Sequence, residues 1–356
     1  MKSITHPTLL IDQTKVVNNI RRMKQKADVS GIVFRPHFKT HQNHQVAEIF
    51  RNEGVKKITV SSVSMATGFA AQGWNDITVA FPVNLREMEE INRLSKNIRL
   101  NLLVDSGFST LFLLKHAQHP LTIFIEIDTG YHRTGLVPED PEIEFIINEI
   151  SSSRLLTFGG FLTHAGHTYQ ARGQAEILDI MDQSRKQMLE LKHHHERFHP
   201  EFILSYGDTP SCSLASHFNG FDEIRPGNFV YYDVMQFHLG ACSLEDIAVA
   251  AACPVVSVMK ERGEMAIYGG AVHLSKEHIV ADQGFKLFGY VVRLDRNLHW
   301  SDPIPGAYVY SLSQEHGLIK MSEKELVTFK PGDLVGILPV HSCLTADLLK
   351  EKFLMI

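Results

Sequence analysis

One lysine stands where it can do covalent chemistry. Lys39 lies in the segment RPHFKTH (35–41), which closes a short apolar run and so marks the end of a candidate strand. Burial at such a strand end lowers the pKa of a lysine toward that of a nucleophilic amine, and such an amine forms a Schiff base with a carbonyl compound. An ordinary surface lysine in a loop is the alternative. His37 and His41 flank Lys39, and the sequence leaves open whether they tune the lysine or support the strand end.

Small and polar residues follow several later apolar runs. Backbone N–H groups in such turns can approach a phosphate, although single glycine-containing turns are common in any loop. Together with the lysine and several cationic side chains, they fit a phosphorylated aldehyde cofactor, of which pyridoxal phosphate is the obvious one. The phosphate-type residues are Tyr206, Gly207, Asp208, Thr209, Gly227 and Asn228, and the other polar groups at strand ends include Arg133, His164 and Arg225.

A second constellation is the triplet His341-Ser342-Cys343, at the end of another strand-like run. On an extended strand, residues i and i+2 project from the same face, so His341 and Cys343 can both reach one cation. Nitrogen and sulfur ligands together favour zinc. A chance pair is the alternative, because zinc needs more than two ligands and the others would come from water, substrate or elsewhere.

The elements that must position these groups alternate regularly in the first two thirds of the chain. Short apolar, β-branched runs alternate with longer amphipathic segments, the pattern of consecutive βα units. Eight such runs favour a (β/α)₈ TIM-type barrel over an open doubly wound sheet, and the active site of such a barrel lies at the carboxyl ends of its strands. The predicted strands are 32–38, 57–62, 76–81, 99–105, 121–128, 155–164, 202–206 and 223–232, and the predicted helices include 14–27, 41–53, 84–95, 107–118, 141–151 and 172–198.

After about residue 240 the pattern changes to strands separated by turn signals, with no helix between them. We therefore expect an α/β protein with a barrel domain over 13–240 and a β-rich second domain over 1–12 and 241–356. The opening strand 8–12 could pair with either domain. The predicted strands of the second domain are 254–260, 264–272, 285–293, 307–313 and 326–340, and a helix over 345–353 closes the chain.

Composition excludes several classes of protein. The 356 residues carry a formal net charge of −5 and are 44% hydrophobic, as in a packed globular chain. No basic tract suggests nucleic acid as a partner, no apolar run is long enough to cross a membrane, and the start does not read as a signal peptide. The four cysteines are spread along the chain and read as free thiols or ligands. We expect a cytoplasmic enzyme.

The motifs resemble those of the fold-type III pyridoxal phosphate enzymes, in particular the D-serine dehydratase and D-threonine aldolase branch of the alanine racemase-like superfamily. The resemblance covers nearly the whole chain and implies a barrel that carries the cofactor, a C-terminal β domain and a homodimer. It rests on RPHFKTH (35–41), EIDTGYHRTG (126–135), SYGDTPSC (205–212), EIRPGNFVYYD (223–233) and PVHSC (339–343).

The resemblance also implies roles for single residues. Lys39 looks like the lysine that binds the cofactor, Arg133 like the arginine that contacts its phenolic oxygen, and His164 like the histidine beside its ring. Arg225 matches an arginine that faces the pyridine nitrogen in alanine racemases, a position that varies among the lyases. The remaining matches are the phosphate-binding residues Tyr206, Gly207, Asp208, Thr209, Gly227 and Asn228.

The same resemblance favours a metal site at His341 and Cys343 over a chance pair. D-Serine dehydratases of this branch carry a His-x-Cys pair where this chain has His341 and Cys343, whereas D-threonine aldolases more usually carry His-x-Asp. Zinc-assisted dehydration of D-serine is therefore the leading hypothesis, followed by retro-aldol cleavage of 3-hydroxy-D-amino acids and then by racemisation. A non-catalytic cofactor carrier is disfavoured by the full β domain. Residues 193–195 (HHH) read as a solvated patch, and Cys212, Cys242 and Cys253 read as buried small side chains.

Overall fold

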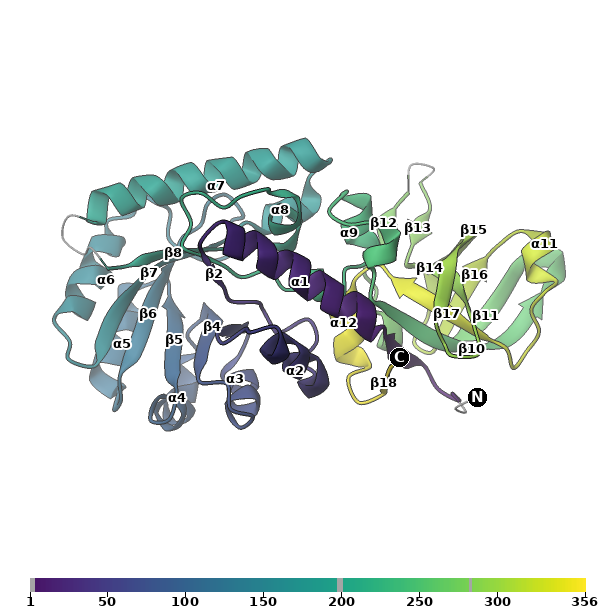
Figure 1. Cartoon of the computed structure of the whole chain (residues 1–356), viewed down its shortest axis with the longest axis horizontal. Coiled ribbons are helices and arrows are strands. Elements are labelled where there is room, and N and C mark those ends of the chain that lie inside the picture. The colour runs from purple at the N-terminus through teal and green to yellow at the C-terminus, as the bar shows by residue number, and fades with distance from the viewer. Residues whose placement is uncertain (1–3, 197–200, 282–283) are drawn as a thin grey trace. The chain divides into compact units, whose positions relative to one another are not determined.

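The computed structural model describes residues 4–196, 201–281 and 284–356 (Figure 1). The chain forms two compact units, each discontinuous in sequence. The barrel unit comprises Arg22–Lys39 and Ala47–Gly227, and the β unit comprises Met1–Arg21, Thr40–Val46 and Asn228–Ile356. The predicted domain boundary near residue 240 stays a prediction.

A parallel sheet of eight strands forms the barrel unit, in the order β2-β9-β8-β7-β6-β5-β4-β3. Its runs are almost continuously apolar because helices cover one face and the interior the other. The two edges meet at a parallel bridge between His37 and Thr59, beside which the Phe38 N–H donates to the Thr59 carbonyl over 2.8 Å. The predicted α/β fold with an eight-stranded barrel is confirmed. The strands are β2 (Val33–Phe34), β3 (Ile58–Val60), β4 (Asp76–Pro82), β5 (Arg99–Val104), β6 (Leu121–Glu126), β7 (Leu156–His164), β8 (Ile203–Gly207) and β9 (Glu223–Ile224).

Helices connect these strands and lie on the outer face of the sheet (Figure 1). Ser62 and Ser106 cap two of them, since each hydroxyl accepts the N–H three residues on. The predicted helix 172–198 is α7, which ends at His195, and positions 197 and 198 lie outside the described residues. The helices are α1 (Gln13–Val29), α2 (His44–Asn52), α3 (Val63–Ala70), α4 (Met88–Ser95), α5 (Gly107–His116), α6 (Glu142–Ser151), α7 (Gln174–His195) and α8 (Thr209–Leu214), with 3₁₀ turns η1 (Leu85–Glu87) and η2 (Gly166–Gln170).

The first and last barrel strands are shorter than predicted. The predicted strand 32–38 is paired as a strand only at Val33–Phe34, and the predicted strand 223–232 only at Glu223–Ile224. A proline follows each of them at the second position, Pro36 and Pro226, and proline has no N–H for a strand ladder. The chain beyond each proline is therefore a loop, and the second loop contains the 3₁₀ turn η3 (Asn228–Val230).

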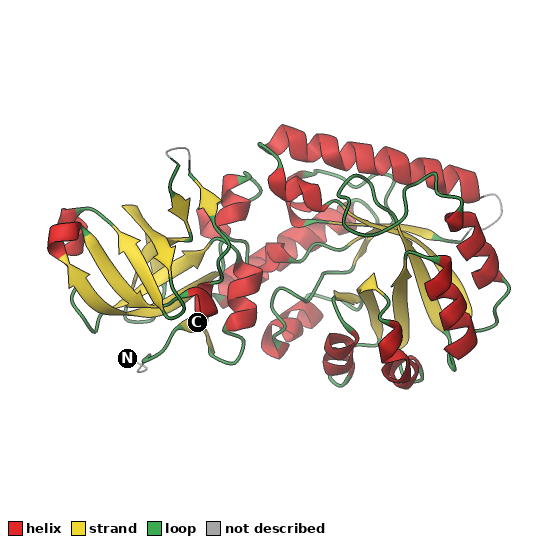
Figure 2. Ribbon diagram, turned by 180° about the vertical axis from the view of Figure 1, so that it is seen from behind, coloured by secondary structure: helices red, strands yellow, loops and turns green. Residues whose placement is uncertain are grey.

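Antiparallel strands form most of the β unit. Six of them close a ring, since β11 pairs with both β16 and β10 and the order runs β11-β16-β15-β14-β17-β10. A bulge between Val255 and Ser257 bends β10 between its partners. Strand β1 pairs with β10 and β18, so the opening strand belongs to this unit. The strands are β1 (Thr8–Ile11), β10 (Val249–Met259), β11 (Glu264–Tyr268), β14 (Gly289–Leu294), β15 (Trp300–Leu312), β16 (His316–Lys320), β17 (Leu334–Pro339) and β18 (Phe353–Met355), with a separate pair β12 (Ile279–Val280) and β13 (Lys286–Leu287) (Figure 2).

Several predictions for this unit are wrong. The predicted strand 264–272 ends at Tyr268 because the chain turns at Gly270, where a Cβ would lie 2.3 Å from the Gln314 carbonyl oxygen. Strands β16 and β18 were not predicted. The predicted closing helix 345–353 is α12, which begins and ends earlier. Short helices do intervene: α9 (Val234–His238), α10 (Ala271–Leu274), α11 (Glu323–Leu326) and α12 (Ser342–Leu348), with turns η4 (Leu244–Asp246) and η5 (Lys260–Arg262). Among the described residues, no helix is both long and apolar enough to span a membrane.

Candidate active site

Lys39 lies in the turn after β2, two residues beyond His37, which forms a parallel bridge with Thr59. Its side chain is exposed, so the prediction that burial surrounds this lysine is wrong for the chain as described. The neighbouring ring of Phe38 is instead completely buried and packs against Phe50, Phe69 and Trp74, with ring centroids 5.0, 5.0 and 5.1 Å away. This anchor fixes the backbone of the turn and leaves the amine of Lys39 accessible.

His164 ends β7 and is the centre of a cationic group. Its Nδ1 lies 2.6 Å from the Gly207 carbonyl oxygen, which can only accept, so Nδ1 carries the proton and Nε2 is the acceptor. Burial lowers the pKa of His164 to about 3, helped by the positive charges of Lys39, Arg133 and Arg225. The structure thus brings three predicted cationic residues together around the neutral imidazole of His164.

Two residues near this group were missed by the sequence analysis, although both stand in the motif EIDTGYHRTG. The Tyr131 ring meets His164 edge-on at 5.8 Å and lies under the Arg133 guanidinium at 5.3 Å. It comes this close to the chain because Gly166 has no Cβ, which would stand 2.4 Å from the ring. Glu126 is a buried carboxyl whose pKa is raised, mainly by burial. The almost continuous burial of β6 could have flagged Glu126 as a polar side chain at a buried position.

The loop after β8 has the character expected of an anion site. Asp208 caps α8, since its Oδ1 accepts the Ser211 N–H over 2.6 Å, and burial raises its pKa to about 6. The buried hydroxyl oxygen of Thr209 has no hydrogen-bond partner among the described residues. A Cβ at Gly207 would lie 3.2 Å from Arg225, so glycine allows this close approach. Tyr206 points elsewhere: its ring stacks on Phe221 and its hydroxyl lies 3.0 Å from Ser211 Oγ.

Arg225 belongs to a chain of buried polar groups inside the barrel, which we name the Glu223 network. Arg225 donates to Ser205 Oγ over 2.7 Å, and Ser205 donates to Glu223 Oε1 over 2.6 Å. The second oxygen of Glu223 accepts from Arg35 Nε over 2.5 Å, and Arg35 also pairs with Asp76 at 2.7 Å. Burial lowers the pKa of Arg225 to about 10, so it stays cationic at neutral pH. Its Nε–H is buried and has no partner among the described residues.

These residues fit pyridoxal phosphate. An accessible amine (Lys39), a neutral imidazole (His164) and two cations stand together, and Thr209 and Arg225 each present an unpartnered polar atom. Gly207 and the buried Gly227 supply backbone that a bulky anion can approach.

His341 and Cys343 are in contact, but not as predicted. His341 is the N-cap of α12 and Cys343 lies in the first helical turn, so the premise of one extended strand is wrong for Cys343. Burial opposes both charged forms, yet the hydrogen bond between the pair raises the pKa of His341 to about 9 and lowers that of Cys343. An imidazole and a thiolate side by side are a donor set that suits zinc. No cluster of three or more His, Cys, Asp or Glu ligands occurs in the described part of the chain, so further ligands are left to water or substrate.

Asn228 was predicted to bind the phosphate, but its side chain lies beside Cys343. Its amide nitrogen donates to Asp233 Oδ2 over 2.6 Å and to Ser342 Oγ over 3.0 Å, and lies 3.5 Å from the sulfur of Cys343. The amide of Asn228 therefore faces the metal pair.

Three cysteines and the histidines at 193–195 were predicted to have no role in the site, and the structure corrects one detail of that prediction. Cys212 and Cys253 are completely buried and Cys242 is half-buried. His193 is exposed, as expected of a solvated patch. His195 is instead buried and packs on the Phe161 ring at 5.6 Å, so the prediction fails for this histidine.

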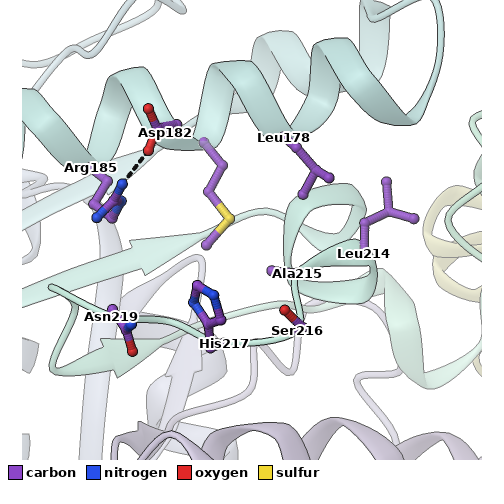
Figure 3. A pocket seen from close by; sticks show the side chains of 9 residues that line it. Leu178, Asp182, Arg185, Leu214, Ala215, Ser216, His217 and Asn219 are labelled. Carbon is purple, nitrogen blue, oxygen red and sulfur yellow. Dashed lines mark hydrogen bonds and ion pairs between the residues drawn. The ribbon is translucent and has the colours of Figure 1, made fainter.

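A separate cavity of about 260 Å³ lies beside α7 in the barrel unit (Figure 3). Leu178 and Arg185 line it from the helix, and His217 and Asn219 line it from the loop after α8 (Figure 3). None of the residues that the sequence analysis selected lines this cavity.

Known proteins resemble both parts of the chain. The family model "Alanine racemase, N-terminal domain" matches residues 11–234, and "Putative serine dehydratase domain" matches residues 248–355. The D-serine dehydratase of Dictyostelium discoideum is 29% identical over 99% of this chain and 93% of its own length.

The solved structure of D-threo-3-hydroxyaspartate dehydratase from Delftia sp. HT23 superposes with a TM-score of 0.89 at 27% identity, over 97% of this chain and 93% of its own. A variant of that dehydratase, solved in a form described as metal-free, superposes with the same TM-score, identity and coverage.

Proposed function

Because the chain belongs to the alanine racemase N-terminal domain family, within the alanine racemase-like superfamily, we propose that it is a pyridoxal phosphate-dependent lyase. We propose D-serine as its substrate and pyruvate and ammonia as its products. The main support for dehydration is the contact between the imidazole of His341 and the thiol of Cys343. A metal held there would act on the hydroxyl that leaves the substrate.

We propose that the cofactor binds in the barrel unit. Pyridoxal phosphate, when bound, supplies a ring that stabilises negative charge at the substrate carbon. Lys39 would bind it covalently, Arg133 would contact its phenolic oxygen, and His164 would lie against its ring. The phosphate would be held by the hydroxyl of Thr209 and by backbone at Tyr206, Gly207, Asp208, Thr209, Gly227 and Asn228, with Arg225 facing the ring nitrogen.

The charges of the site support one side chain as the group that transfers protons. The pKa of His164 is about 3, so its imidazole is neutral at physiological pH and does not deliver a proton. Arg225 keeps its proton as well, with a pKa of about 10. We propose the exposed amine of Lys39 as the base that removes the α-proton of the substrate.

We propose that His341 and Cys343 bind a zinc ion. Zinc, when bound, supplies a Lewis acid for the developing charge on the leaving hydroxyl. Two protein ligands leave coordination positions open, so water or the substrate hydroxyl can enter. The chain's own part is to hold the two ligand atoms together.

We further propose a cytoplasmic homodimer with a barrel domain over 13–240 and a second domain over 1–12 and 241–356. The four free thiols suit a reducing compartment. Light scattering of the purified holoenzyme tests the dimer, and a monomer would reject it.

The test of the function is product analysis with D-serine, L-serine, D-threonine and D-threo-3-hydroxyaspartate. We expect pyruvate from D-serine, and loss of this turnover when a chelator removes the metal. D-Threonine separates the alternatives, since elimination yields 2-oxobutyrate whereas retro-aldol cleavage yields glycine and acetaldehyde. Glycine as the main product would replace the dehydratase with an aldolase, and interconversion of D- and L-serine would indicate a racemase.

The cofactor attachment has its own test. Borohydride reduction of the holoenzyme followed by peptide mapping should place the pyridoxyl group on Lys39. A label on another lysine would reject this assignment, and the Lys39→Arg variant should take up no label at that position.

A further inference from the structure

The sulfur of Cys343 lies between two polar side chains of the β unit. The hydroxyl oxygen of Thr40 is 3.2 Å from Sγ, and the amide nitrogen of Asn228 is 3.5 Å from it. Thr40 is completely buried and Asn228 is 4% exposed. Burial restricts both side chains, so they stay close to the sulfur.

The orientation of Asn228 is decided by a carboxylate. Asp233 Oδ2 accepts from the Asn228 amide over 2.6 Å, and an ionised carboxylate can only accept. The nitrogen of this amide, and not its oxygen, must then face Asp233 and the neighbouring sulfur. Asp233 also accepts from the Ser342 N–H over 2.9 Å, so one carboxylate fixes both Asn228 and the start of the helix that carries Cys343.

The direction of the Thr40 contact follows from the state of the sulfur. Either partner can donate while Cys343 is a thiol. A metal-bound cysteine is a thiolate and has no proton, so only the hydroxyl of Thr40 can then donate. Metal binding thus turns Thr40 into a hydrogen-bond donor to the ligand atom.

We propose that Thr40 tunes the metal through the Cys343 sulfur, an inference that rests on the proposed metal site. Hydrogen bonds to a thiolate reduce the electron density that it gives to a metal. The metal is then a stronger Lewis acid toward the hydroxyl of a β-hydroxy amino acid. Thr40 is a positioning residue that acts through Cys343, and outer-shell partners of this kind change metal affinity or activity by about 10- to 100-fold.

The experiment uses the full-length holoenzyme with Co²⁺ in place of Zn²⁺. The difference spectrum between the two metal forms removes the absorbance of the cofactor and leaves the thiolate-to-cobalt charge-transfer band. Thr40→Val keeps the shape of the side chain but removes the donor, so the energy of the sulfur lone pair rises. We expect the band to move to longer wavelength in Thr40→Val and to stay in place in Thr40→Ser. In the zinc enzyme, kcat should fall about 10-fold in Thr40→Val with little change in KM.

Thr345 offers a matched control within α12. It is also completely buried, and its hydroxyl donates to the Leu274 carbonyl over 3.4 Å instead of to sulfur. Thr345→Val should leave the band where it is in the parent protein. Should Thr40→Val fold poorly, Thr40→Ala provides a second variant without the donor, and circular dichroism reports folding for each.

The proposal is overturned if the Thr40→Val band coincides with that of the parent, or if the parent binds Co²⁺ without any thiolate band. Failure of the proposed function would give a different result from failure of the tuning proposal. A parent that shows the band and its shift but yields no pyruvate from D-serine would reject the substrate and keep the tuning of Cys343.

Discussion

Two buried carboxylates, Glu223 in the barrel unit and Asp233 in the β unit, organise their surroundings in different ways. Both are 1% exposed. Glu223 pairs directly with Arg35 and reaches Arg225 through Ser205, so its charge is balanced by cations. Asp233 accepts from neutral donors: the Asn228 amide, the N–H and hydroxyl of Ser342, and the Gln236 N–H.

The surroundings of Asp233 should therefore tolerate the loss of a carboxylate better than the Glu223 network does. A buried charge stays ionised only when partners compensate it. The Glu223 network holds four charged groups of alternating sign, namely Arg35, Arg225, Glu223 and Asp76. Loss of one carboxylate leaves an arginine uncompensated. Loss of Asp233 leaves neutral donors unsatisfied, which costs less free energy.

The largest effect is expected at Glu223. Glu223→Ala leaves two buried guanidinium groups without their shared anion, and breaking a buried pair in this way costs about 3–5 kcal/mol of unfolding free energy. Urea denaturation at pH 7 measures this loss. The exposed ion pairs of α7 are the control: Asp182→Ala, which removes the pairs with Arg185 and Lys186, should leave the unfolding free energy nearly unchanged. A Glu223→Ala protein as stable as the parent would show that the network is not electrostatically coupled.

A smaller effect is expected at Asp233. Asp233→Ala removes the acceptor of Asn228 and Ser342, and unsatisfied buried donors of this kind cost about 1–3 kcal/mol. Unlike Glu223→Ala, this variant should also lower the bound metal, because the start of α12 and the amide beside Cys343 both lose their anchor. Urea denaturation measures the loss of unfolding free energy, and mass spectrometry measures the loss of bound metal.

The comparison fails in one defined case. If Asp233→Ala destabilises the protein more than Glu223→Ala while its metal content is unchanged, Asp233 serves the fold alone and the contrast between the two carboxylates is wrong. Asp246→Ala is a suitable control, since this carboxylate caps an exposed turn at Ser243 and should leave metal content unaffected.

The same two regions explain what the sequence could predict. The eight barrel strands were predicted because buried strands are apolar along their length, as in β6. The Glu223 network was not, because its members are polar and their pairing joins Arg35 to Glu223 across 188 residues. Nothing local in either segment marks these side chains as buried.

His341 and Cys343 were predicted to lie side by side, which they do, but on an extended strand, which they do not. The apolar run ending at Val340 predicts an extended chain that continues through Cys343. The helix begins at Ser342 instead, because its first N–H is accepted by Asp233, 109 residues away in sequence. His341 supplies no side-chain cap of its own. The sequence signals for a helix start are local, so they do not reveal a cap such as Asp233 that is distant in sequence.

The smallest effect concerns pH and compares one histidine of the β unit with the solvent-exposed histidines. Burial lowers the pKa of His41 to about 3, against 6.5 for an ordinary histidine. The unfolded chain therefore binds the extra proton between these two pH values, and the unfolding free energy falls as the pH drops through that window. From pH 7 to pH 6 this histidine alone should account for about 0.7 kcal/mol.

His41→Gln should therefore lose less stability than the parent when the pH is lowered from 7 to 6. The sign follows from the proton count: the parent's unfolded state gains a proton that its folded state refuses, and the variant has no such group in either state. His193→Gln is the matched control, since the His193 side chain is 90% exposed and contacts the solvent in both states. Parallel pH profiles for the parent and His41→Gln, measured by urea denaturation in one buffer series, would show that His41 takes up its proton in the folded protein as readily as in the unfolded chain.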